Sequence, residues 1–336
     1  MTHLPNDMAA LVYTGPNALD VTRAPLPVPG PDEALVRVRA VGICGSDMHA
    51  YHGHDSRRPA PLILGHEAAG EVVGGPRHGA RVTINPLVIP AGDAAAAAGR
   101  PHLSAARQIL SMPPRPGAFA EYVAAPLANL LDVPDDFPLA KAALAEPMAV
   151  SWHAVRIGIE RLFGAPFATA LVLGGGAIGV GAALVARHMG AGAVWLAETN
   201  AARRDRLSGL EGISVCTPEV AAQSCDGCDL VIDAVGAVAT RAAASALVRP
   251  GGVIVHVGLL PGEAGFDIRR ITLQEITLTG SYCYTPQDFA DCFSSMVSGA
   301  LGPLDWAETR ALSGGPAAFA DLDGGRVAAP KVILQP

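Results

Sequence analysis

Apolar and polar residues follow two different patterns along the chain, and the change comes near residue 146. Before it, the pattern predicts short β-strands separated by turns rich in proline and glycine, at 8–13, 33–44, 70–73, 80–85 and 118–123. After it, short continuous apolar runs predict buried strands at 168–173, 193–197, 229–234 and 252–257. Helical stretches lie between these runs, for example at 177–189 and 203–210, and a short helix and a last strand at 331–334 follow Gly280.

Strands that alternate regularly with helices are typical of a doubly wound parallel sheet. The sequence therefore predicts an α/β protein in which a β-rich part precedes a Rossmann-type part. A length of 336 residues is enough for two domains, and half of the residues are hydrophobic while 16% are charged. This composition excludes an intrinsically disordered chain.

The net charge of −7 and the lack of a basic stripe argue against a nucleic-acid partner. No apolar run reaches the roughly 20 residues of a membrane span, so we expect no membrane partner. Residues 1–10 carry no secretion signal, and the six cysteines are scattered rather than arranged as a disulfide framework. We therefore expect a reduced, cytoplasmic protein that acts on a small molecule.

A glycine-rich motif directly after the strand at 168–173 predicts a dinucleotide site. It consists of Gly174, Gly175, Gly176, Ala177, Ile178 and Gly179. The first glycine permits a tight turn, Gly176 lets the backbone approach a pyrophosphate, and Gly179 permits close contact between helix and strand. The N-terminus of the following helix offers free N–H groups to phosphates. The alternative is a glycine-rich turn that binds no nucleotide.

Glu198 ends the next strand, about 20 residues after this motif. A carboxylate there can accept hydrogen bonds from both hydroxyls of an adenine ribose and would repel a 2′-phosphate. The sequence therefore favours NAD over NADP. Arg203 and Arg204 keep NADP open, because arginine binds phosphate well.

Zinc prefers thiolate, imidazole and carboxylate ligands, and the chain offers this set of residue types in Cys44, His66 and Glu67. Between them lie a hydroxyl and a second imidazole, Ser46 and His49, which could carry a proton away from a metal. Each of these residues has an ordinary structural interpretation by itself. Together with a dinucleotide site, they indicate a zinc-dependent alcohol dehydrogenase.

The chain resembles the medium-chain dehydrogenase/reductase family, and within it the branch of polyol (sorbitol), L-idonate and threonine dehydrogenases. The resemblance rests on Gly42-Ile43-Cys44-Gly45-Ser46-Asp47 and on Gly65-His66-Glu67-Ala68-Ala69-Gly70. It implies a GroES-like catalytic domain formed by 1–148 and 283–336, and a Rossmann domain at 149–282, with zinc beside the nicotinamide. It also implies a homo-oligomer, either a dimer or a tetramer.

The resemblance assigns roles to individual positions. Cys44 and His66 match two catalytic zinc ligands, and Glu146 matches the third ligand of the polyol and threonine branch. Glu67 matches a carboxylate that ligates zinc in some members only, so the third ligand stays open; Glu146 could instead cap the helix that starts near Pro147. Ser46 and His49 match the proton relay, although His49 could be an ordinary surface residue. Tyr51 and Phe119 match substrate-pocket positions, and Asp47 is a candidate partner for a ligating imidazole.

The sequence departs from the family where many relatives hold a second, structural zinc with four cysteines. The corresponding positions are Pro90, Asp93, Ala96 and Ser104, so we expect one catalytic zinc and no structural zinc. The pair Cys225 and Cys228 has metal-type spacing, but no second pair accompanies it, so we interpret it as coincidental. Arg57 and Arg58 could bind a phosphorylated substrate, although a solvated loop is the favoured interpretation.

The function predicted from the sequence is hydride transfer between a secondary alcohol, polyol or sugar-derived, and NAD with the help of zinc. One alternative is a metal-free, NADPH-dependent reductase of the quinone-reductase type. Another is a non-catalytic family member that only binds NAD.

Overall fold

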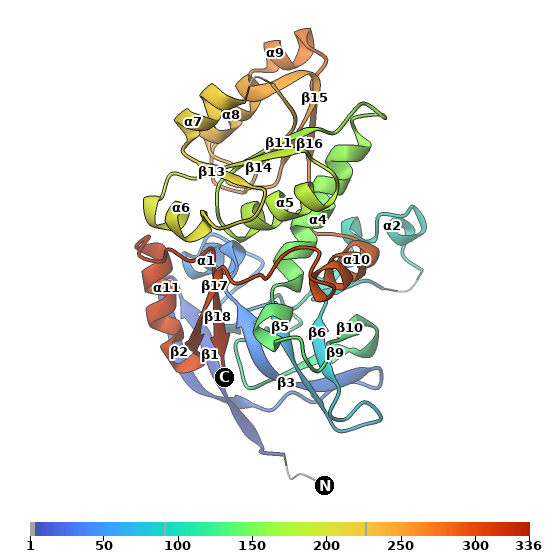
Figure 1. The fold of residues 1–336 in the computed structure, drawn as a ribbon. Coiled ribbons are helices and arrows are strands. Elements are labelled where there is room, and N and C mark those ends of the chain that lie inside the picture. The colour runs from blue at the N-terminus through green and yellow to red at the C-terminus, as the bar shows by residue number, and fades with distance from the viewer. Residues whose placement is uncertain (1–3, 91, 226) are drawn as a thin grey trace. The chain divides into compact units, whose positions relative to one another are not determined.

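The computed structural model describes residues 4–90, 92–225 and 227–336, which form two compact units (Figure 1). Unit 1 comprises 1–146, 307–327 and 331–336, and unit 2 comprises 147–306 and 328–330. The sequence placed 283–306 in the first domain, whereas the contacts of this segment group it with unit 2. Its helix is tied to unit 2 by the polar network described below.

Unit 1 is rich in β-structure, as the alternation before residue 146 predicts. Its strands are β1 (Asp7–Gly15), β2 (Ala18–Pro25), β3 (Glu33–Gly42), β4 (Leu62–Ile63), β5 (Glu67–Val73), β6 (Arg81–Ile84), β7 (Leu87–Val88), β8 (Gln108–Ile109), β9 (Tyr122–Pro126), β10 (Leu130–Asp132), β17 (Ala307–Ala311) and β18 (Lys331–Gln335). Its helices are α1 (Gly45–Tyr51), α2 (Ala94–Ala97), α3 (Leu139–Ala142) and α11 (Gly315–Asp323), with short 3-10 turns at Pro101–Leu103, Leu127–Asn129 and Leu312–Gly314.

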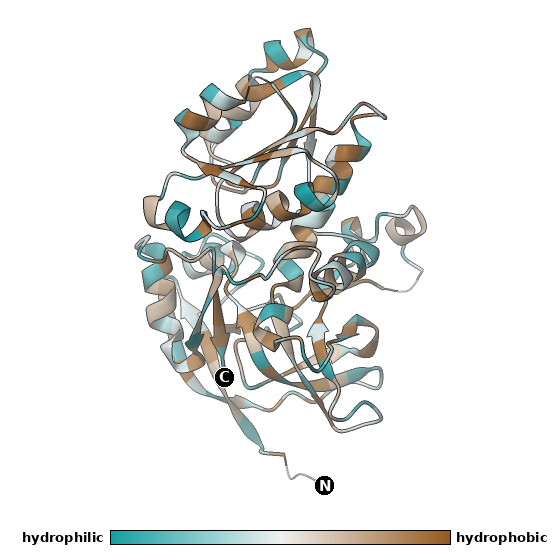
Figure 2. Ribbon diagram, viewed as in Figure 1, coloured by the Kyte–Doolittle hydropathy of each residue, from teal (hydrophilic) through white to brown (hydrophobic). Residues whose placement is uncertain are grey.

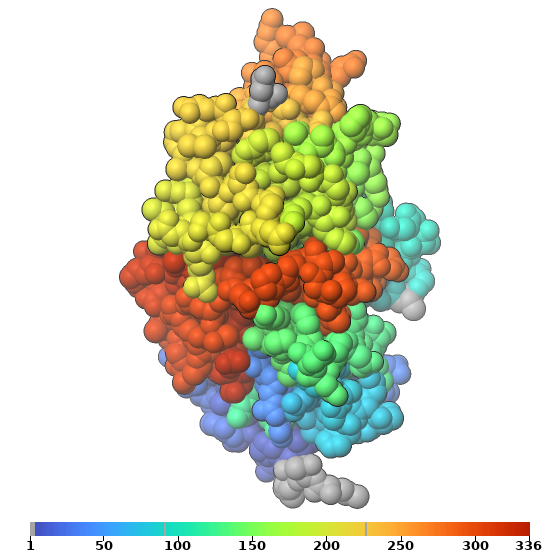
Figure 3. Space-filling model, viewed as in Figure 1, coloured from blue at the N-terminus to red at the C-terminus, as the bar shows by residue number. Residues whose placement is uncertain are grey.

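The main sheet of unit 1 joins both ends of the chain. Its strand order is β10-β6-β5-β3-β18-β17, and β9 also pairs with β3. The C-terminal strand β18 is antiparallel to β3, with Ile333 opposite Gly42. Helix α11 packs against β2, where the space-filling view shows red C-terminal atoms beside blue N-terminal atoms (Figure 3). The pairing of β18 with β3 therefore places residues from both chain ends side by side within one sheet.

Unit 2 contains the predicted parallel sheet. Its elements are β11 (Thr169–Leu173), α5 (Ala177–His188), β12 (Ala193–Ala197), α6 (Ala201–Leu207), β13 (Ser214–Cys216), α7 (Pro218–Ser224), β14 (Cys228–Asp233), α8 (Val238–Leu247), β15 (Val248–His256), α9 (Ile268–Leu273), β16 (Thr277–Gly280) and α10 (Pro286–Val297). The strand order is β13-β12-β11-β14-β15-β16, and all neighbours are parallel. Helix α4 (Ala145–Glu160) begins in unit 1 and continues in unit 2.

Hydropathy follows this architecture (Figure 2). The central strand β11 is mostly apolar and its neighbour β14 is buried throughout, whereas the arginines of α6 give it a polar outer surface. In the described part of the chain, no helix is both long and apolar enough to cross a membrane.

The strand predicted at 118–123 begins later in the structure, because the observed strand β9 covers Tyr122–Pro126. The apolar residues before it pair irregularly with the chain near His66. The backbone N–H of Ala118 donates to the carbonyl of Gly65 at 2.8 Å, and that of Phe119 donates to Leu64 at 2.9 Å. A buried apolar run was therefore recognised correctly, but its backbone bonds belong to a loop.

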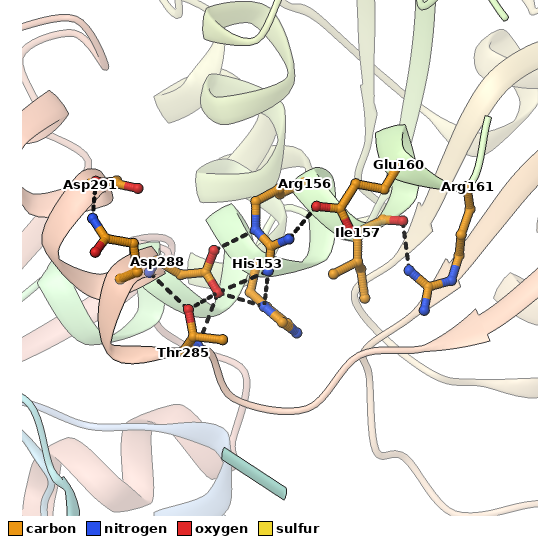
Figure 4. A network of polar contacts seen from close by, with 9 residues as sticks. His153, Arg156, Ile157, Glu160, Arg161, Thr285, Asp288 and Asp291 are labelled. Carbon is orange, nitrogen blue, oxygen red and sulfur yellow. Dashed lines mark hydrogen bonds and ion pairs between the residues drawn. The ribbon is translucent and has the colours of Figure 1, made fainter. Parts of the chain in front are cut away.

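A buried polar network connects α4 with α10 in unit 2 (Figure 4). His153 Nδ1 lies 2.7 Å from one oxygen of Asp288, and Arg156 Nε donates to the other oxygen at 2.6 Å. Thr285 donates its hydroxyl to the same carboxylate at 2.7 Å. Burial raises the pKa of Asp288, but the hydrogen bonds from His153 and Arg156 outweigh burial and hold this pKa well below its usual range.

We expect Asp288→Asn to lower the free energy of unfolding by about 3 kcal/mol at neutral pH, because it removes a buried charge that several donors satisfy. The folded-state pKa is lowered, so this stabilisation is present above the ordinary aspartate pKa of about 4 and is lost as the pH falls through the folded value. Thermal unfolding of both proteins should therefore show a difference at pH 7 that shrinks near pH 3. Asp291→Asn, on the exposed side of the same helix, is the control; a loss independent of pH would contradict this explanation.

Candidate functional site

Cys44, His66 and Glu67 come together in unit 1. One ligand atom from each lies within 4.8 Å of the other two, and this is the single group of metal-ligating side chains of its kind in the described ranges. The three residues were predicted from the sequence as zinc ligands. The group leaves Glu146 out, so of the two carboxylates that the sequence left open, Glu67 lies nearer to the other two ligands.

The pairing of β3 with β5 creates this group. Gly42, the last residue of β3, lies opposite Glu67, the first residue of β5. Cys44 lies two residues after the end of β3 and caps the N-terminus of α1, while His66 immediately precedes β5. A side chain at position 42 would not fit, because a Cβ atom there would lie 1.9 Å from Oε2 of Glu67.

Asp47 fixes the two loops that carry Cys44 and His66. One carboxylate oxygen accepts the backbone N–H of Cys44 at 2.9 Å, and the other accepts that of Gly65 at 3.3 Å. The second oxygen also lies 3.6 Å from His66 Nδ1. Burial lowers the pKa of His66, but the charges and hydrogen bonds of Asp47 and Cys44 together outweigh burial and raise this pKa. Asp47 therefore orders the backbone and orients the imidazole.

Glu67 is completely buried and forms an ion pair with Lys331 on the C-terminal strand β18. Lys331 Nζ donates to Oε1 of Glu67 at 2.7 Å and to the carbonyl of Ile43 at 2.8 Å. Burial lowers the pKa of Lys331, but the charges of Glu67, Cys44 and Glu146 outweigh burial and raise it. A buried lysine is tolerated here because negative groups surround it.

The second oxygen of Glu67 is suited to bind a cation. Oε2 is buried and has no hydrogen-bond partner within the part of the chain that the structure describes. A buried carboxylate oxygen without a partner is costly, and it lies in the group with a thiol and an imidazole. One sulfur, one nitrogen and one oxygen are a donor set that fits Zn²⁺.

The remaining predicted residues lie around this centre in different ways. Ser46 and His49 are half-buried and lie three positions apart on α1, which places them on one side of the helix. Glu146 is buried in the first turn of α4. Tyr51 and Phe119 both pack against Phe319, with ring centroids 5.4 and 5.9 Å apart. Phe119 has no exposed surface, so a substrate contact of this residue is still only a prediction.

Hydrogen bonds connect the two ends of the lobe at 92–104, where the family resemblance places a structural zinc in many members. The side chain of Asp93 caps the short helix α2, and it accepts a hydrogen bond from the hydroxyl of Ser104 at 2.7 Å. These two residues occupy two of the four positions that the sequence analysis matched to structural-zinc cysteines of the family. Elsewhere, Cys225 and Cys228 are buried in an apolar cluster of unit 2, and none of the six cysteines forms a disulfide bond within the described residues.

The glycine motif adopts the geometry expected of a dinucleotide site. Gly174 has φ +98°, a left-handed conformation that glycine adopts easily. A Cβ atom on Gly179 would lie 1.7 Å from the carbonyl oxygen of Gly174, so only glycine permits this close contact. Gly176 caps α5, and a Cβ there would meet no atom within 4 Å. Ala177 and Ile178 form the first turn, where free N–H groups can bind phosphate.

Glu198 lies beside this motif and is held by the backbone. One oxygen accepts the N–H of Gly175 at 2.8 Å, and the other accepts that of Asn200 at 2.7 Å. Burial raises the pKa of Glu198, but these backbone bonds outweigh burial and lower it. Arg203 Nη1 lies 3.5 Å from the carboxylate. Glu198 is therefore ionised and fixed at the end of β12, where a ribose hydroxyl could reach it.

Sequence reasoning missed two buried residues near Cys44, His66 and Glu67, namely Lys331 and Ser111, and it favoured an exposed position for a third, Arg58. Lys331 left a signal, since lysine occurs at only two positions of this arginine-rich chain and here opens an apolar strand. Arg58 was interpreted as part of a solvated loop but is only 3% exposed. Ser111 gave no signal, because its contacts come from distant segments.

Family models match both parts of the chain. The model described as alcohol dehydrogenase GroES-like domain matches residues 30–135, and the one described as zinc-binding dehydrogenase matches residues 177–298. L-galactonate-5-dehydrogenase of Escherichia coli (strain K12) is 34% identical over 88% of this chain and 88% of its own length. Sorbitol dehydrogenase of Homo sapiens is 32% identical over 83% of this chain and 82% of its own. A structure of a zinc-binding dehydrogenase from Sinorhizobium meliloti 1021, bound to NADP, matches with TM-score 0.89 and 28% identity over 99% of this chain and 100% of that one.

Proposed function

The chain belongs to the zinc-dependent alcohol dehydrogenase family, and from this premise we propose that it transfers hydride between a polyol or sugar-derived secondary alcohol and NAD. The observation that carries the proposal is the buried, unpartnered Oε2 of Glu67 beside Cys44 and His66. The named relatives act on a sugar acid and on a polyol, which supports this substrate class. The metal-free alternative leaves Oε2 of Glu67 buried without a partner within the described residues.

Cys44 and His66 would hold a single zinc, with Glu67 as the third ligand. When bound, zinc supplies a Lewis acid that lowers the pKa of an alcohol hydroxyl. The thiolate and the carboxylate balance its charge, while Lys331 keeps Oε1 of Glu67 occupied and so directs Oε2 toward the metal. The lobe at 90–104 has no cysteine, which supports one zinc per chain.

Ser46 accepts the proton of the alcohol hydroxyl, and His49 accepts it next and releases it to solvent. Their shared side of α1 supports this sequence of transfers. The glycine motif and Glu198 would hold NAD⁺, which would supply the acceptor for the hydride of the carbinol carbon, so that alcohol and NAD⁺ would give ketone, NADH and one proton. In the reverse direction, His49 and Ser46 return the proton to the product alcohol.

Zinc analysis combined with NAD⁺ reduction tests this function. We expect one zinc per chain and formation of NADH with polyols or sugar acids from a panel that also contains simple alcohols and L-threonine. A protein without zinc that instead reduces quinones with NADPH would support the metal-free alternative. Nucleotide binding without turnover of any alcohol would support a non-catalytic role.

NAD is the proposed cofactor because Glu198 is ionised and fixed. We expect Glu198→Ala to lower kcat/KM for NAD about tenfold or more, because hydrogen bonds to a charged acceptor are lost. The same change should improve the use of NADP, since the repulsion of a 2′-phosphate disappears and Arg203 remains. The measurement is the ratio of kcat/KM for the two cofactors, with the exposed Glu211→Ala as control. An unchanged ratio would place the ribose contact elsewhere.

We also propose that the chain forms a homo-oligomer, either a dimer or a tetramer. Its proposed location is the cytoplasm. The oligomer rests on family membership, and the cytoplasmic location rests on the scattered cysteines, which form no disulfide bond within the described residues. Light scattering of the purified protein measures the oligomeric state directly. A monomer at working concentration would contradict it.

A further inference from the structure

Ser111 has an unusual backbone for a residue with a side chain. Its φ is +69°, in the left-handed region that favours glycine, and the residue is completely buried. Such a conformation persists only where the surroundings impose it, and these positions cluster at functional sites. Because serine rather than glycine adopts this conformation, we expect the side chain of residue 111 to make an interaction that offsets the backbone strain.

The side chain of Ser111 points to the metal-ligand group. Its Oγ lies 3.4 Å from Nδ1 of His66, closer than the nearest oxygen of Asp47, which lies 3.6 Å from the same nitrogen. Asp47 is also engaged by the backbone N–H groups of Cys44 and Gly65. Ser111 is thus a second oxygen that faces the same ring nitrogen.

Arg58 holds Ser111 in this position from the other side. Its Nε donates to the carbonyl of Ser111 at 3.1 Å, and its Nη1 donates to Asp55 at 2.7 Å and to the carbonyl of Ser46 at 3.4 Å. The planar guanidinium offers several donors in a fixed geometry, so it fixes Ser111 relative to α1. A buried arginine with this set of partners explains how the left-handed backbone is maintained.

We propose that Ser111, fixed by Arg58, is a positioning residue for His66, and that its hydroxyl oxygen accepts the Nδ1–H of the imidazole. This arrangement selects one tautomer of His66 and leaves Nε2 as the ligand atom. Partners of this kind orient metal-binding imidazoles, and their loss lowers metal affinity. The inference rests on the proposed zinc function.

Two substitutions separate the hydroxyl from the backbone strain. Ser111→Ala removes the hydroxyl and keeps the strain, whereas Ser111→Gly removes both, because glycine adopts a positive φ without cost. Ser245→Ala is the matched control, since Ser245 is a buried serine of unit 2 whose hydroxyl donates to the carbonyl of Arg241 at 3.0 Å. All variants are prepared in the full chain.

Zinc affinity is measured by competition with a chelator, and the absorption spectrum of the cobalt-substituted protein reports the geometry of the ligands. We expect both Ser111 variants to bind zinc about tenfold more weakly and to shift the cobalt bands. The melting temperature of Ser111→Gly should equal or exceed that of Ser111→Ala, and Ser245→Ala should match the wild type in affinity and spectrum.

An affinity within about threefold of the wild type for either Ser111 variant overturns the positioning role. In particular, if Ser111→Ala binds zinc weakly while Ser111→Gly binds it as tightly as the wild type, then backbone strain, and not the loss of the hydroxyl, lowers the affinity. If the wild type binds no zinc, or if Cys44→Ala binds zinc as tightly as the wild type, the proposed function itself is overturned together with this inference.

Discussion

Replacement of Cys44 by alanine is expected to remove zinc and to reduce alcohol oxidation by roughly three orders of magnitude or more, because a Lewis acid contributes several kcal/mol to the transition state. The thiolate is the strongest anionic donor of the group formed with His66 and Glu67. The fold should survive, because Asp47 accepts the backbone N–H of residue 44 whatever its side chain is. NAD binding should also survive, since the glycine motif lies in unit 2.

Metal content, NADH formation and NAD affinity are the three measurements for this prediction. Cys292→Ala is the control for loss of a thiol, because Cys292 is buried on α10 in unit 2. We expect that variant to keep its zinc and its rate and to lose only some stability. Full zinc content or an unchanged rate in the Cys44 variant would show that the metal ligands are elsewhere.

The sequence predicted what depends on local pattern. The strand at 193–197 was predicted with its observed bounds, and the helix after the glycine motif ends one residue earlier than expected. These elements are defined by short apolar runs and by glycines whose conformation has few alternatives. Cys44, His66 and Glu67 could be predicted as one group for the same reason, because they lie in two short motifs.

What the sequence could not predict depends on contacts between distant segments. Lys331 is 264 residues from Glu67 in the chain, and its partner follows only from the pairing of β18 with β3. Ser111 reaches His66 across 45 residues through a loop without regular structure. The third ligand stayed open for the same reason, since the sequence contains two suitable carboxylates but not their distances to Cys44.

Separate substitution of Glu67 and of Glu146 by glutamine distinguishes these two candidates for the third zinc ligand. We expect Glu67→Gln to lose zinc and most activity, because it removes the negative charge from the side chain that lies in the group with Cys44 and His66. Glu146→Gln should keep one zinc per chain, because this carboxylate lies outside that group. Loss of zinc from the Glu146 variant alone would assign the third ligand to Glu146.

Glu67→Gln also leaves the ammonium of Lys331 buried without its charged partner, which should cost about 3–5 kcal/mol of stability. A double variant, Glu67→Gln with Lys331→Met, removes that unpaired charge and should recover much of the loss in melting temperature. It should not recover zinc, because an amide oxygen supplies no negative charge to the metal. Recovery of zinc together with stability would mean that Glu67 serves only as the partner of Lys331. Recovery of stability alone would show that one carboxylate performs two separable tasks, pairing with the lysine through Oε1 and binding the metal through Oε2.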